Sequence, residues 1–196
     1  MRPFSSLCWR GCKLPELHVF DFDGTLFRSP MPPAWWSQKK DWWTFSESLG
    51  RPCVPDKPDD SWWVGRTVQQ AKRSISNPDV WAILCTGRSE RSFARWRGPE
   101  LLRQKGLNFD EVRLSPQTGI LGQFKQDIVR AILGRLPQVT TVHVWDDTPD
   151  ILGTLKRAVL GMGRECFTYQ VRVTVLQNLS FYPKEEQGVW FLLRRK

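Results

Sequence analysis

The stretch LHVFDFDGTLF, residues 17–27, decides the fold, because an apolar run ends in two carboxylates that are followed at once by glycine and threonine. Such an apolar run is typical of a buried strand in a parallel sheet, and Gly24 allows the chain to turn away sharply. Asp21 and Asp23 are therefore expected at the carboxyl end of this strand. Ligands of open α/β sheets bind in the crevice outside the carboxyl ends of the strands, so this position indicates a site.

Two acids at this position suit phosphoryl chemistry. One carboxylate can attack phosphorus to form an aspartyl-phosphate, and a second acid two residues on can protonate the leaving oxygen and later activate water. The two acids repel each other unless a cation joins them, and Mg²⁺, which takes hard oxygen ligands and bridges to phosphate, is the expected cation. The alternative is that Asp-x-Asp-Gly-Thr is only a turn after a strand or a fragment of a calcium loop.

The composition is that of a soluble globular protein with a basic surface. The chain has 196 residues, enough for one sizeable core. No apolar run reaches the ~20 residues that a membrane span needs. The 29 basic and 20 acidic residues give a net charge of +9, which either attracts an anionic partner or only serves solubility. Five scattered cysteines without metal-ligand spacing predict neither a disulfide framework nor a zinc site, and thus a reducing, intracellular compartment, cytoplasmic by default.

The chain is expected to have three parts. Residues 1–16 form a flexible arm whose basic residues faintly resemble a transit peptide, so organelle import stays open as an alternative. Residues 17–196 form a single domain that contains an insertion over residues 28–66, where prolines interleave with three Trp-Trp pairs. These rings either form a small satellite core or line the site and stack on nucleobases. They are Trp35, Trp36, Trp42, Trp43, Trp62 and Trp63.

A second apolar run, residues 80–85, also ends in a polar turn, Thr86-Gly87-Arg88. We expect a short helix over residues 67–76 before it and a helix over residues 89–105 after it, with Ser89 as its N-cap. The junction offers a hydroxyl, backbone N–H groups and a guanidinium to a phosphate. Taken alone, this junction is better explained as a turn with a capping hydroxyl.

Two later junctions carry further charged residues. A third strand is expected over residues 111–114, and Lys125 then lies at the start of a helix over residues 123–136, where the helix dipole does not favour a cation. A fourth strand, residues 140–145, ends in Asp146-Asp147 and leads into another helix. The alternative for Lys125 is that a lone lysine is usually a solvated surface residue. The alternative for the acid pair is helix capping, which explains Asp147 but does not explain why Asp146 directly ends a buried strand.

Three further predictions concern the sheet. Residues 165–176 are expected to form a fifth strand at an edge of the sheet. His18 and His143, the only two histidines, both lie inside predicted strands at like distances from the terminal acids. We interpret both histidines as core or sheet-face residues and not as catalysts.

The four junctions, Asp21/Asp23, Thr86, Lys125 and Asp146/Asp147, resemble in their order the four motifs of the haloacid dehalogenase-like (HAD) superfamily. Within it, the sequence is similar to the Swiss Army Knife RNA repair-like HAD family and to the 3'-phosphatase domains of polynucleotide kinase-phosphatases. The likeness covers residues 17–160. This sequence departs from the family pattern at Thr148, since arginine often follows the acid pair in the family. The departure leaves the substrate less defined than the chemistry. It is carried by residues 19–30, the Trp-Trp pairs, residues 85–88, Thr118 with Phe124-Lys125, and the acid pair.

The resemblance implies an α/β fold, a Rossmann-like parallel sheet with helices on both faces. It also implies that Asp21 is the nucleophile, Asp23 the acid and base, and that Thr86 and Lys125 hold the phosphoryl oxygens. Mg²⁺ would lie among Asp21, Asp23 (through its backbone carbonyl), Asp146 and Asp147. The residues implied to contact substrate are Gly24, Thr25, Gly87 and Arg88.

We therefore expect a Mg²⁺-dependent phosphatase that acts on phosphorylated nucleic-acid ends, RNA or DNA, in repair or processing, with no membrane partner. One alternative keeps the chemistry and changes the substrate to a nucleotide or small metabolite, but an insertion of roughly 40 residues is small for an enclosing lid. Another alternative is a noncatalytic nucleic-acid-binding module on the same fold. Retention of the acids, the hydroxyl and the lysine argues against it.

Overall fold

The sheet has five strands, all parallel, in the order β3-β2-β1-β4-β5. The computed structural model describes residues 16–33, 36, 42–94, 97–116 and 120–173. The fold class predicted from the sequence is confirmed. The strands are β1 (Glu16–Phe20), β2 (Val80–Thr86), β3 (Glu111–Leu114), β4 (Thr141–Asp146) and β5 (Glu165–Gln170).

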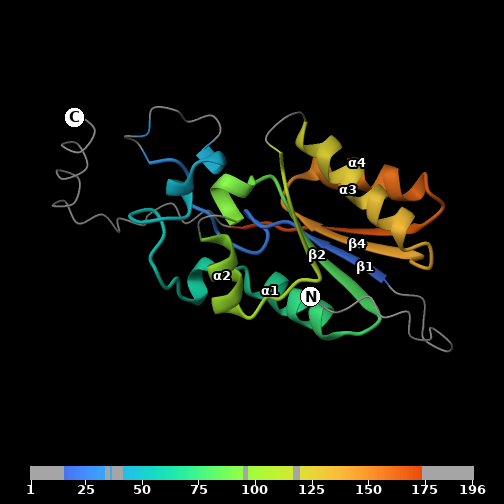
Figure 1. Cartoon of the computed structure of the whole chain (residues 1–196), viewed down its shortest axis with the longest axis horizontal. Helices are drawn as coiled ribbons and strands as arrows, with labels where there is room; N and C mark the ends of the chain where they lie inside the picture. Colours follow the sequence, from blue (N-terminus) through green and yellow to red (C-terminus); the bar gives the residue numbers. More distant parts are fainter. Residues whose placement is uncertain (1–15, 34–35, 37–41, 95–96, 117–119, 174–196) are drawn as a thin grey trace.

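Helices cover both faces of the sheet, as predicted (Figure 1). Helices α1 and α2 lie on one face and helices α3 and α4 on the other (Figure 1). The buried apolar residues of α3 and α4 pack against one face of the sheet, and those of α1 and α2 pack against the other. The helices are α1 (Gly65–Ser76), α2 (Gly98–Lys105), α3 (Leu121–Arg135) and α4 (Pro149–Leu160).

Strand β1 divides the core into two layers because its side chains alternate between the faces. Leu17 and Val19 pack in the apolar cluster formed with α3 and α4. Phe20 packs in the opposite cluster with Trp145, where the two rings stack with centroids 4.5 Å apart. Because β1 is central and buried on both faces, the acids that follow it are held at a fixed position.

The single helix predicted over residues 89–105 is wrong. The structure has a π-helical turn, Glu90–Ala94, and then starts α2 at Gly98. Ser89 caps the first piece, since its Oγ accepts a hydrogen bond from the backbone N–H of Ser92 at 3.2 Å. Pro99 lies in the first turn of α2, where its missing N–H costs nothing, so the chain restarts a helix there.

Other boundaries differ by a few residues. Helix α1 begins at Gly65 and α3 at Leu121, two residues before each predicted start. Strand β5 lies at a sheet edge, as predicted, but it ends at Gln170; residues 171–173 are not strand, and residues 174–176 lie outside the described residues. Of the predicted arm, Glu16 is the first residue of β1 and residues 1–15 lie outside the description.

The described residues of the insertion contain three short 3₁₀ helices, gathered at one end of the sheet (Figure 1). Trp36 and Trp42 form a small cluster with Cys53. Trp62 and Trp63 lie beside Phe27 in the large cluster that also contains Phe20. All four rings are buried, but the satellite-core interpretation is confirmed only for Trp36 and Trp42, since Trp62 and Trp63 pack in a large core cluster of the domain. Trp43 is partly buried, and Trp35 lies outside the described residues. The 3₁₀ helices are Trp42–Thr44, Ser46–Ser48 and Asp60–Trp62.

Within the described residues, no helix is long and apolar enough to cross a membrane. The three cysteines that the description includes, Cys53, Cys85 and Cys166, are buried, and Cys85 and Cys166 are free thiols. Cys8 and Cys12 lie outside it.

We predict that Trp63→Ala lowers the free energy of unfolding by about 3–5 kcal/mol, because it empties a packed site beside Phe27. Met31→Ala, at an exposed position of the same insertion, is the control and should change stability by no more than about 0.5 kcal/mol. Denaturant unfolding measures both. Equal effects of the two changes would contradict the role of Trp63 in the core.

Candidate active site

The candidate site lies where three adjacent strands end. Asp21 directly follows β1, Thr86 is the last residue of β2, and Asp146 is the last residue of β4. From β1 the chain first builds β2 and β3 on one side and then crosses to β4 on the other. The two acids therefore lie at the point where the strand order reverses, which is the usual ligand site of an open α/β sheet.

Lys125 joins the acids of the two strands. Its Nζ, which comes from the second turn of α3, donates to Asp21 Oδ1 and to Asp146 Oδ2, each at 2.7 Å. All three side chains are buried. Asp146 is held further by the backbone N–H of Thr148, which donates to its Oδ1 at 2.9 Å.

The electrostatics of the site favour an added cation. Burial raises the pKa of Asp21 to about 8, opposed by the charge of Lys125 and assisted by Asp146 and Asp23. Burial alone would lower the pKa of Lys125, but Asp21 and Asp146 more than offset it and hold that pKa above its usual value. The pKa of Asp147 is also raised, by burial and then by Asp146. One ammonium thus neutralises only part of the acid charge.

The donor set fits a hard divalent cation. One oxygen from each of Asp21, Asp146 and Asp147 lies within 4.8 Å of the others. Gly24 makes this possible: its φ is +69°, and a Cβ there would lie 2.3 Å from Asp147 Oδ2. Three carboxylate oxygens converging on one point are the ligands that Mg²⁺ takes in proteins.

Asp23 has a different partner. Its carboxylate accepts from Arg88 Nε at 3.0 and 2.9 Å and from Arg88 Nη2 at 2.7 Å, and Ser29 Oγ also donates to it. The Asp23 side chain is 22 % exposed, whereas Arg88 is fully buried. The structure therefore brings together Asp21, Asp146 and Asp147, and it places the Asp23 carboxylate in a separate ion pair.

Arg88 also ties the insertion to the site. Its Nη1 donates to Ser48 Oγ at 2.6 Å and to the carbonyl of Trp43 at 3.2 Å. Its guanidinium lies 5.9 Å from the ring centroid of Phe22. These contacts favour a positioning role, and the contact of Arg88 with substrate stays a prediction. The contacts of Ser29 and Ser48 were not predicted from the sequence, because serines in an irregular segment give no signal before their partner is known.

The remaining predicted residues line the same turns. Thr86 is buried, and its Oγ1 accepts from the backbone N–H of Arg88 at 3.2 Å. Gly87 lies against Leu121, which a Cβ would approach to 3.1 Å. Thr25 is buried, and among the described residues its hydroxyl has no hydrogen-bond partner. An unpaired buried hydroxyl is costly unless a ligand completes it.

The chain belongs to the HAD domain family 1 of Swiss Army Knife RNA repair proteins, whose model matches residues 28–189. Asp21 and Asp23 precede the matched segment.

Solved structures share the fold. A chain of the Pnkp1/Rnl/Hen1 RNA repair complex is 15% identical with a TM-score of 0.54, over 82% of this chain and 44% of that chain. A second structure of the Pnkp1/Rnl/Hen1 complex is 16% identical with a TM-score of 0.52, over 82% and 48%. This chain thus spans less than half of those chains. The HAD domain of effector protein Lem4 from Legionella pneumophila is 12% identical with a TM-score of 0.48, over 92% and 94%.

We predict that Gly24→Ala weakens Mg²⁺ binding at least about tenfold, because the new methyl group displaces Asp147. Gly134→Ala is the control: it meets open space in α3 and should slightly raise stability without changing Mg²⁺ affinity. The shift of the thermal midpoint with Mg²⁺ concentration measures the affinity. If both variants kept the shift of the unaltered protein, Asp147 would not belong to the cation site.

Proposed function

We propose that this chain is a Mg²⁺-dependent phosphatase that forms an aspartyl-phosphate on Asp21 and acts on the phosphate ends of polynucleotides. The observation that carries the proposal is the buried Asp21–Lys125–Asp146 arrangement at the ends of β1 and β4. Phosphoryl transfer needs little beyond in-line positioning and neutralisation of charge, and Lys125 is a fixed cation beside the proposed nucleophile.

In the first step, a carboxylate oxygen of Asp21 forms a bond to phosphorus as the bond from phosphorus to the leaving oxygen breaks. Asp23 gives a proton to that leaving oxygen. Lys125 and Thr86 bind the oxygens of the phosphoryl group. Because both Asp23 oxygens accept from Arg88, the acid role requires Asp23 to release at least one of these hydrogen bonds when substrate binds.

In the second step, water attacks the phosphorus of the aspartyl-phosphate, and Asp23 takes a proton from that water. The bond between phosphorus and Asp21 breaks, inorganic phosphate leaves, and Asp21 is restored. Asp21, Asp146 and Asp147 would hold Mg²⁺, which when bound neutralises charge on the phosphate oxygens.

Family membership and charge support a polynucleotide substrate. The family is defined on RNA repair proteins, and two of the similar folds belong to an RNA repair complex. A net charge of +9 attracts an extended polyanion more strongly than a single phosphate. Burial of Trp36, Trp42, Trp62 and Trp63 removes most of the insertion's rings as base-stacking platforms, so the attraction is expected to be to phosphates.

We predict that Asp21→Asn lowers kcat at least about a thousandfold with the fold retained, because the amide is nearly isosteric but cannot attack phosphorus. The matched control is Asp150→Asn, the same change at an exposed position in the first turn of α4, and it should keep near-full activity. Phosphate release and circular dichroism are the measurements. A fully active Asp21→Asn variant would assign the nucleophile elsewhere.

A substrate panel tests the polynucleotide assignment: 3'-phosphorylated oligonucleotides, 5'-phosphorylated oligonucleotides and mononucleotides, each with Mg²⁺ and with EDTA. We predict a kcat/KM for one oligonucleotide end at least about tenfold above that for mononucleotides, a fall of this advantage with salt, and no turnover in EDTA. Equal turnover of mononucleotides without salt dependence would instead indicate a metabolite phosphatase. Oligonucleotide binding with no phosphate release would indicate a noncatalytic module.

A further inference from the structure

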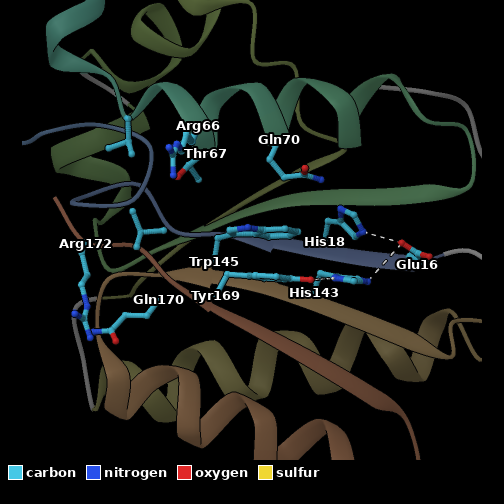
Figure 2. A pocket seen from close by; sticks show the side chains of 12 residues that line it. Glu16, His18, Arg66, Thr67, Gln70, His143, Trp145, Tyr169, Gln170 and Arg172 are labelled. Carbon is cyan, nitrogen blue, oxygen red and sulfur yellow. Dashed lines mark hydrogen bonds and ion pairs between the residues drawn. The ribbon is translucent and has the colours of Figure 1, made fainter.

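The two histidines and one acid meet at the opposite end of β1 from Asp21. Strands β1 and β4 pair in a register that sets His18 beside His143, and their ring centroids lie 4.7 Å apart. Glu16 precedes His18 by two residues, so its side chain lies on the same face of β1. Figure 2 shows the Glu16 carboxylate in contact with both imidazoles.

The hydrogen bonds of His18 determine which of its two ring nitrogens carries the proton. Ser74 Oγ, on α1, donates to the carbonyl of Gln70 at 2.9 Å, so it accepts from His18 Nδ1 at 2.7 Å. A neutral His18 then carries a lone pair on Nε2, and this atom lies 2.9 Å from Glu16 Oε2. Two lone pairs at this distance repel each other unless a cation is shared between them.

His143 has the matching arrangement. Its Nδ1 lies 3.0 Å from the hydroxyl of Tyr169, which can accept a hydrogen bond from it. Its Nε2 lies 3.6 Å from the same Glu16 Oε2, too far for a good hydrogen bond. A metal ion can be shared by ligand atoms of all three residues, whereas one proton is shared by only two of them.

We propose that Glu16, His18 and His143 form a second metal site, for a divalent transition metal of the Zn²⁺ class. Ligand atoms of the three residues lie within 4.8 Å of one another. In a tetrahedral zinc site with bonds of about 2.0–2.2 Å, two ligand atoms lie about 3.3–3.6 Å apart. The distance from His143 Nε2 to Glu16 Oε2, 3.6 Å, lies at the upper limit of this range, and the distance from His18 Nε2, 2.9 Å, lies below it, so binding requires a small outward shift of the Glu16 carboxylate.

The outer contacts have the form that a metal site requires. A ligating histidine usually donates its other ring N–H to a fixed acceptor, which orients the ring. Ser74 Oγ accepts in this way from His18, and the Tyr169 hydroxyl lies where it can accept from His143. Imidazole and carboxylate together suit zinc better than magnesium, so this site and the Asp21 site differ in the metal that each prefers.

The fourth position opens to solvent. An open pocket of about 720 Å³ borders Glu16, His18 and His143 and is also lined by Arg66 and Arg172. Figure 2 shows it between the sheet face and α1. Three protein ligands with one open position define an exchangeable site. Because two arginines line the pocket, water or an anion is the expected fourth ligand.

Zinc titration of the untagged full chain tests the proposal. Cys8→Ser with Cys12→Ser is the background, so that these thiols do not compete, and a chromophoric chelator reports the affinity. We expect one equivalent to bind, with at least about a tenfold loss of affinity in Glu16→Gln and in His143→Gln, both partly exposed positions that tolerate substitution. Asp147→Asn and added Mg²⁺ should leave zinc affinity unchanged.

Nitrogen-detected NMR of the imidazoles gives an independent readout, since the chain has only two histidines. Zinc should shift the Nε2 signals of both rings and leave both Nδ1 atoms protonated. Unchanged imidazole signals at one equivalent of zinc, or undiminished zinc affinity in the Glu16→Gln and His143→Gln double variant, would overturn the proposal. Either outcome leaves the phosphatase assignment untouched, because that assignment rests on other residues.

Discussion

The Lys125 ammonium between Asp21 and Asp146 is the interaction on which the rest of the site depends. Two carboxylates buried at the ends of neighbouring strands are strongly unfavourable without a counter-charge, and a buried pair that loses one partner costs about 3–5 kcal/mol. Lys125 supplies that charge from α3, the helix that leads from β3 toward β4. The site therefore contains its own counter-ion and still retains excess acid charge, which favours a metal cation.

A second buried ion pair links the insertion to the chemistry. Arg88 contacts Asp23 and, through Ser48 and the Trp43 carbonyl, the short helices of the insertion. The position of the proposed acid–base group therefore depends on a segment that is packed through its tryptophans. This dependence gives the insertion a role that needs no stacking on nucleobases. It also explains why a Pro-rich segment carries so many buried rings.

Much of the fold and of the site could be predicted from local patterns. Apolar runs that end in Asp21, Thr86 and Asp146 mark both the strands and the edge at which they meet, because parallel strands share the direction of their carboxyl ends. The pairing of Asp23 with Arg88 could not be predicted, since the two residues are 65 positions apart and each has several partners open to it. The break before α2 was missed, although Pro99 after Gly98 is a typical signal of a helix start. The histidines were correctly placed on a sheet face, but their convergence on Glu16 depends on the register of β1 with β4.

The most direct test of the account is to isolate the covalent intermediate. Asp23→Asn should still accept phosphate from an aryl phosphate, whose good leaving group needs no acid, but it should lose the base that activates water. We predict a burst of one phenol per enzyme and, after acid quenching, a hydroxylamine-labile phosphoryl group on the peptide that contains Asp21. A phosphoryl group on any other residue, or continued full turnover with no burst, would contradict the assignment of Asp21 and Asp23.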